Sequence, residues 1–185
     1  MSRFLLLIAF AIGMTVTLGT FAETNDWPQW RGPDRTGISQ EKELLQAWPE
    51  EGPTLLWLNE NCGIGYSAPT VAKDHLVTMG ARDNVEQLIC LDANSGEELW
   101  AIDVGENYEN GWGDGPRSSP TIDGERVFAL GANGDLVCAE LATGKVQWKV
   151  DLADLGAACQ TGVTRSLYWW MGIRWFARRG ETREP

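Results

Sequence analysis

The sequence predicts an all-β fold built from propeller blades, and three observations support this prediction. One segment is written twice, at residues 67–100 and 118–148, with the starts SAPT and SSPT and the ends Trp100 and Trp148. The copies are offset by 51 residues at the start and 48 at the end. Each copy holds short apolar runs between turn residues. A period near 50 with short strands indicates an array of blades, in which one copy cannot bury its own faces.

Each copy is expected to form four antiparallel strands, which make one blade. In the second copy Asp123-Gly124 is a hairpin signal, because the left-handed backbone of such a turn favours glycine. Lys73-Asp74 occupies the same place in the first copy. The expected strands lie within residues 71–79, 87–91 and 98–101 in the first copy, and within 121–130, 135–139 and 146–149 in the second.

The tryptophan that ends each copy is interpreted as a structural, blade-closing residue. Trp100 and Trp148 follow the turn glycines Gly96 and Gly144, and their large side chains are expected to pack on the neighbouring blade or the preceding turn. Sugar stacking on these indoles is the functional alternative. Trp57 ends a shorter match and predicts a lone outer strand, of the kind with which many propellers close their ring. The final blade is absent, so this strand is expected to lack its sheet.

The first 22 residues are predicted to be a helical secretory signal rather than part of the fold. A basic start at Arg3 precedes an apolar run from 4 to 18 and a small-x-Ala site, so cleavage is expected before Glu23. An uncleaved membrane anchor is the alternative, for which the run is short. The product is therefore expected to be exported, to the periplasm or outside the cell. Residues 23–62 then form an N-terminal segment, and 63–156 form the two blades.

Charge and cysteines exclude some functions. Residues 23–156 carry 24 Asp and Glu against 9 Lys and Arg, so phosphates of nucleic acid and of acidic membranes would be repelled. Cys90 and Cys138 hold equivalent places in the copies, normally too far apart for a disulfide, and are interpreted as buried small hydrophobes. With no CxxC and His75 as the only histidine, no metal or haem site is predicted.

The repeat ends resemble a known family. LDANSGEELW at 91–100 and ATGKVQW at 142–148 are similar to the tryptophan-docking repeat of quinoprotein-type, PQQ-like propellers. DWPQWRGPDRTG at 26–37 and GIGYSAP at 63–69 resemble segments of exported bacterial members. The resemblance covers residues 26–156 and implies the fold. Such propellers include dehydrogenases, assembly scaffolds and other proteins, so it implies no single function. None of the quinoprotein catalytic motifs falls on residues 23–156, so no cofactor is predicted, and PQQ would belong only to an intact parent ring.

The tail, residues 157–185, is predicted to be out of frame and disordered. Trp and Met each have one codon, so reading one base earlier turns Trp169, Trp170 and Met171 into Val-Asp-Gly, a hairpin turn like that at 122–124. The same shift over 158–180 permits MPDWGYSESLLVDGDKVVCTPG, the opening of a third blade. We infer a slip of one nucleotide near codons 155–158, in the gene or in its record. A native Trp- and Arg-rich tail that binds membranes or anionic glycans is the alternative.

The Gly-rich loop 107–117 is the candidate binding site. It offers Tyr108, Trp112, Asp114 and Arg117, and loops between blades commonly carry propeller function. The loop is alternatively a tight crossing between blades. Glu109 and Asp114 would be its carboxylate pair for glycoside hydrolysis, and calcium binding lacks EF-type spacing. The single histidine makes a Ser-His-Asp arrangement improbable, and no catalytic residue is predicted.

Together these observations predict the function. The chain is expected to be a truncated, exported propeller-repeat protein, inactive as written because two blades leave sheet faces and edges exposed. The intact parent is expected to be a non-catalytic binding or assembly scaffold for a protein or small-molecule ligand, with no nucleic acid and no membrane span after signal cleavage. The alternative is an N-terminal fragment of a quinoprotein-like, PQQ-dependent oxidoreductase. Ligand and blade number do not follow from the sequence.

Overall fold

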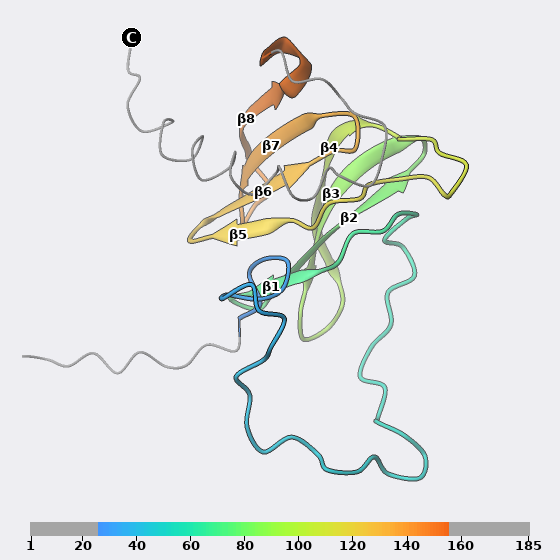
Figure 1. Ribbon diagram of the computed structural model, residues 1–185, viewed down its shortest axis with the longest axis vertical. Helices are drawn as coiled ribbons and strands as arrows, with labels where there is room; N and C mark the ends of the chain where they lie inside the picture. The colour runs from blue at the N-terminus through green and yellow to red at the C-terminus, as the bar shows by residue number, and fades with distance from the viewer. Residues whose placement is uncertain (1–25, 156–185) are drawn as a thin grey trace, which may run out of the picture.

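Two four-stranded antiparallel sheets make up the body of the protein (Figure 1). The computed structural model describes residues 26–155. The predicted all-β fold is confirmed, and a single turn of 3-10 helix, η1 (Leu152–Leu155), follows the last strand. The strands of the first sheet are β1 (Thr70–Ala72), β2 (His75–Arg82), β3 (Val85–Asp92) and β4 (Glu98–Glu106). Those of the second are β5 (Thr121–Asp123), β6 (Arg126–Leu130), β7 (Asp135–Glu140) and β8 (Val146–Asp151).

The two sheets share strand order and register, as the internal repeat predicts. Each sheet runs from its first strand to its fourth through neighbouring strands, so every connection within a sheet is a hairpin. Cys90 pairs with Trp100 in the first sheet, and Cys138 pairs with Trp148 in the second. A register shift follows directly after each of these cysteines. The two segments are therefore two copies of one blade.

The hairpin turns have the backbone that the sequence requires. Lys73 and Asp74 both have positive φ, 51° and 63°, as a two-residue hairpin turn demands. Gly124 has φ 61° in the equivalent turn of the second blade. The predicted turns at both places are confirmed.

The hydrophobic core lies between the blades. Val77, Leu88 and Val104 of the first sheet are fully buried in the same cluster as Val127 and Val137 of the second. Neither sheet covers this face alone, so burial of apolar area couples the two blades. Cys90 belongs to this cluster, and Cys138 is buried outside it; both are free thiols, as predicted. Burial raises the pKa of Cys90 to about 12.

The N-terminal segment bridges the inner edges of both blades before it leaves the body. Trp27 exchanges two backbone hydrogen bonds with Val71 of β1, at 2.7 and 2.9 Å, and the Pro28 carbonyl accepts one from Ile122 of β5 at 2.7 Å. Residues 38–60 then run in a wide loop outside the sheets (Figure 1). Within residues 26–155, no helix has the length and apolar character needed to cross a membrane. The predicted signal, residues 1–22, and the tail, residues 157–185, lie outside the described residues.

Candidate functional site

Indole side chains seated on glycines join successive blades. Trp100 of the first blade donates its Nε1–H to the Leu141 carbonyl of the second at 2.9 Å. A Cβ added to Gly144, at φ 71°, would lie 2.7 Å from the Trp100 ring. Only glycine leaves room for the indole at that turn. Trp100, for which the sequence predicted packing on the neighbouring blade or on the preceding turn, lies on the second blade.

Trp57 docks on the first blade in the same way. Its Nε1–H donates to the Ala93 carbonyl at 3.1 Å, and a Cβ on Gly96 would lie 2.3 Å from its ring. Asn59 adds a side-chain hydrogen bond to the Gly96 carbonyl at 2.9 Å. Residues around Trp57 are not part of a strand within the part of the chain that the structure describes. Trp57 thus meets Gly96 as Trp100 meets Gly144, but without a strand around it.

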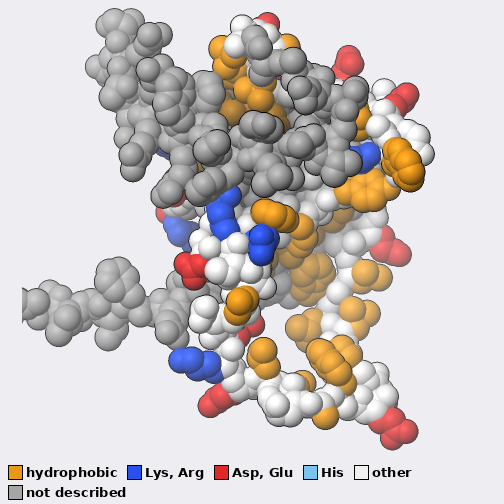
Figure 2. Space-filling model, viewed as in Figure 1, with side chains coloured by type: hydrophobic (Ala, Val, Ile, Leu, Met, Phe, Trp, Pro, Cys, Tyr) orange, Lys and Arg blue, Asp and Glu red, His pale blue; other side chains and the backbone are white. Residues whose placement is uncertain are grey.

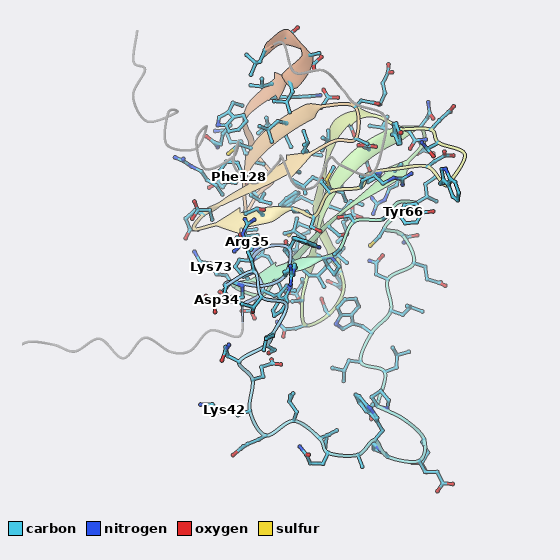
Figure 3. The ribbon with its side chains drawn as sticks, viewed as in Figure 1. Asp34, Arg35, Lys42, Tyr66, Lys73 and Phe128 are labelled. Atoms are coloured by element: carbon cyan, nitrogen blue, oxygen red, sulfur yellow. The ribbon has the colours of Figure 1, made fainter. Side chains whose placement is uncertain are left out.

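The third blade-closing residue, Trp148, packs within its own blade. Its ring lies 6.0 Å from that of Phe128, centroid to centroid, at a tilt of 50°. Trp148 of β8 is paired with Cys138 of β7, and Cys138 is paired with Phe128 of β6. The Trp148 ring thus reaches across β7 to a residue of the next strand. Figure 3 labels Phe128 on the second sheet.

A buried carboxylate, Glu86, ties the loop after β4 to the second blade. Its side chain is fully buried near the start of β3. One carboxylate oxygen accepts the Ala132 N–H of the second blade at 2.7 Å, and the other accepts the Tyr108 N–H at 3.3 Å. Burial raises the pKa of Glu86, although both hydrogen bonds favour the charged form. No pattern in the sequence marks Glu86, because a glutamate beside a turn usually faces water.

Polar groups of loop 107–117 form hydrogen bonds with one another. Asp114 Oδ1 accepts the Asn110 N–H at 2.8 Å, and Asn110 Nδ2 donates to the Tyr108 hydroxyl at 2.9 Å. Arg117 donates to the Gly113 carbonyl and, at 3.3 Å, to that of Asp114. Three of the four predicted site residues, Tyr108, Asp114 and Arg117, are therefore engaged inside the loop.

Tyr66, from outside the loop, completes this arrangement. The Arg117 guanidinium carbon lies 4.4 Å from the centre of the Tyr66 ring and 5.5 Å from that of Tyr108. The Tyr66 hydroxyl donates to the Trp112 carbonyl at 3.0 Å. Figure 3 shows Tyr66 beside the loop that leads from β4 to β5. The GIGYSAP segment had signalled family resemblance, but no pattern in the sequence placed it against loop 107–117.

Trp112 is the fourth predicted residue and the one that faces solvent. Its side chain is 93% exposed, and the neighbouring Tyr66 is 61% exposed. Ile64, whose carbonyl lies against Gly115, is 55% exposed. Figure 2 shows hydrophobic side chains gathered at this edge of the body. The loop thus presents an apolar surface rather than a set of reacting groups.

The side chains weighed for catalysis make hydrogen bonds to the backbone. The Ser118 hydroxyl donates to the Leu130 carbonyl at 2.5 Å, and the Ser67 hydroxyl accepts the Met79 N–H at 3.2 Å. His75 Nδ1 lies 2.7 Å from the carbonyl of Lys73 in a turn. Among residues 26–155 there is no group of three or more His, Cys, Asp or Glu side chains placed to hold a metal ion.

The first strands of the two blades carry few charged side chains. In a propeller the first strand of each blade lines the central channel, here β1 and β5. These strands read TVA and TID and carry one carboxylate and no cation with which to bind the carboxylates of PQQ. The outward N–H groups of Val71 and Ile122 are already bonded to Trp27 and Pro28.

Blades joined by indole-on-glycine contacts define a β-propeller-repeat protein of the tryptophan-docking type. A family model described as outer membrane protein assembly factor BamB matches residues 34–168, and the chain belongs to this family of PQQ-like propellers. No curated protein sequence matches the chain.

Two solved structures are similar in part. A europium-containing methanol dehydrogenase is 19% identical with a TM-score of 0.37 over 46% of this chain. BamB from Moraxella catarrhalis is 21% identical with a TM-score of 0.31 over 42% of it. The matched regions span 15% of the dehydrogenase and 20% of BamB.

Proposed function

We propose that this chain supplies the first blades of an exported, non-catalytic propeller that acts as a binding scaffold in the assembly of cell-envelope proteins. The observation that carries the proposal is the match of residues 34–168 to a family described as an outer membrane assembly factor. The presentation of Trp112 on a braced loop supports it, because an exposed aromatic on a rigid support suits binding. Truncation of the chain, relative to a complete ring, is part of this proposal.

The non-catalytic part of the proposal rests on where the reactive side chains lie. Ser67 and Ser118 serve the backbone of their blades, and His75 bonds in a turn. Asp114, half of the carboxylate pair considered for glycoside hydrolysis, braces its own loop. We propose that the chain uses no cofactor, because its inner strands lack cations for a carboxylate-bearing quinone.

Export is supported by the leader-like composition of residues 1–22 and by the family description. The acidic body, with a net charge of −15 over residues 23–156, argues for protein partners rather than nucleic acid. An oxidoreductase fragment, the alternative from the sequence, has no comparable support from the side chains of residues 26–155.

The test follows the full chain, with a C-terminal tag, in a bacterium that has an outer membrane. We expect a periplasmic product that begins at Glu23 by N-terminal sequencing, and chemical cross-links to outer membrane assembly proteins. A cytosolic product that retains Met1 would refute export. Dye reduction by the purified chain with an alcohol, PQQ and Ca²⁺ would refute the non-catalytic role and restore the oxidoreductase alternative.

A further inference from the structure

Trp112 is the most exposed large hydrophobic side chain of the described residues, at 93%. An isolated apolar side chain on a surface needs no explanation, but this one sits on a loop with dedicated support. The indole is the largest apolar side chain available, and leaving it in water forgoes a large gain from burial. Its position therefore calls for a partner.

The support keeps the Trp112 backbone in place. Its N–H donates to Asn110 Oδ1 at 3.0 Å, and its carbonyl accepts the Tyr66 hydroxyl at 3.0 Å. Gly113 lies so close to Tyr66 that an added Cβ would be 2.1 Å from the hydroxyl oxygen. A loop fixed in this way loses little conformational entropy when a ligand binds.

The surface around Trp112 is apolar at its centre and acidic at its rim. Tyr66, whose hydroxyl bonds the Trp112 carbonyl, is exposed beside it, and Ile64, whose carbonyl lies against Gly115 of the same loop, is exposed as well. Glu106 and Glu109 are exposed on the chain just before it. Arg117, a cation of the same loop, lies over two tyrosine rings and donates to two carbonyls, so its charge is engaged inside the loop.

This combination selects the chemistry of the occupant. An acidic rim attracts Lys and Arg, and an exposed indole face binds cations and aliphatic side chains alike. Anionic lipid would be repelled by Glu106 and Glu109, and by the acidic body as a whole. We infer that Trp112, Tyr66 and Ile64 form a docking surface for a segment of a partner protein in which Arg or Lys alternates with aliphatic residues. This inference rests on the proposed scaffold function and names its partner surface.

The test measures binding of a fluorescein-labelled peptide of alternating Arg and Leu to the purified full chain by anisotropy. We expect saturable binding that weakens with salt, and no binding of the matched Glu-Leu peptide. Trp112→Ala and Glu109→Lys should each raise Kd about tenfold. Trp48→Ala removes another indole, 70% exposed on the outer loop, and should leave Kd unchanged. All three side chains are exposed, so equal thermal midpoints are expected.

Several results would overturn the inference. Unchanged Kd in Trp112→Ala would do so, and so would a Trp112-dependent preference for phosphatidylglycerol vesicles or for chitohexaose over the Arg-Leu peptide. The scaffold function is scored separately, by cross-linking in cells. If Trp112→Ala keeps both the cross-links in cells and the wild-type Kd for the peptide, the docking surface is refuted and the scaffold function stands. Absence of envelope cross-links from the wild-type chain refutes the scaffold instead.

Discussion

At the scale of single residues, the blades are joined where an indole packs against a glycine. The indole occupies the space that a side chain at the glycine position would need. Gly144 accommodates Trp100, and Gly96 accommodates Trp57, with both glycines in the left-handed region at φ 71° and 73°. Gly124 has a similar φ of 61° but no atom within 4 Å of an added Cβ. Substitution of Gly124 therefore reports the cost of the backbone conformation alone. Substitution of Gly144 reports that cost together with the loss of tryptophan docking.

Gly144→Ala is therefore expected to destabilise the chain by about 2–4 kcal/mol, because the new methyl displaces the Trp100 ring from its seat. Gly124→Ala, the matched control, should cost only the backbone term of about 1–2 kcal/mol. Urea unfolding followed by tryptophan fluorescence measures both. Equal losses in the two variants would show that docking at Gly144 contributes nothing beyond backbone strain.

Glu86 makes stability depend on pH with a defined sign. Burial raises its pKa, so the folded state binds the proton more tightly than the unfolded chain does. The contribution of Glu86 to stability is therefore greatest below its ordinary pKa and declines as pH rises through the raised value. Glu86→Gln removes this titration.

The quantity to follow is the difference in free energy of unfolding between wild type and Glu86→Gln. This difference should fall as pH is raised from about 4 toward neutrality, and then become constant. Denaturant unfolding at a series of pH values, for both proteins in parallel, measures it. A difference that stays flat, or rises with pH, would mean that the two N–H groups on the carboxylate outweigh its desolvation.

At the scale of elements, turn chemistry fixes the register that places Trp100 and Trp148 on equivalent edges. The β2–β3 turn, Asp83-Asn84, has φ values of 47° and 66°, and the Asn84 carbonyl accepts the Asn107 N–H that starts the candidate loop. Asp-Gly is the favoured pair for such a turn.

Asn84→Gly should therefore stabilise the chain by about 0.5 kcal/mol, whereas Asn84→Val should destabilise it by about 1–2 kcal/mol, because a β-branched residue resists positive φ. Neither change removes the backbone carbonyl that contacts Asn107. Thermal unfolding followed by circular dichroism gives both shifts. Changes of the same sign would show that the side chain of Asn84, rather than its backbone, matters at this turn.

At the scale of the whole molecule, each blade depends on its neighbours. The core is shared between the sheets, and the apolar side chains of Leu55, Leu56 and Leu58 beside Trp57 are 71–85% exposed. Figure 2 shows hydrophobic side chains along this outer segment. A two-blade piece is short of the burial that offsets chain entropy, so we attribute any activity to a larger array.

The nucleotide sequence tests this view. Resequencing of codons 150–160, followed by reading one base back, should reveal further repeats ending in Gly-x-x-x-Trp, spaced about 40–55 residues apart. Their absence would contradict the frame slip.

The sequence by itself determined the blades, because strand periodicity, turn residues and the repeated Gly-x-x-x-Trp pattern are local signals that tertiary contacts reinforce. It also pointed to packing of Trp100 on the neighbouring blade and marked loop 107–117, whereas the contact of Trp148 with Phe128 of its own blade was not foreseen. Only the tertiary structure showed that Arg117 lies over Tyr66, that Glu86 is buried between the blades, and that Trp112 alone of the four predicted residues faces solvent. These contacts join residues 22 to 51 positions apart, and no local pattern encodes them, because the packing of one blade on the next decides which side chains meet.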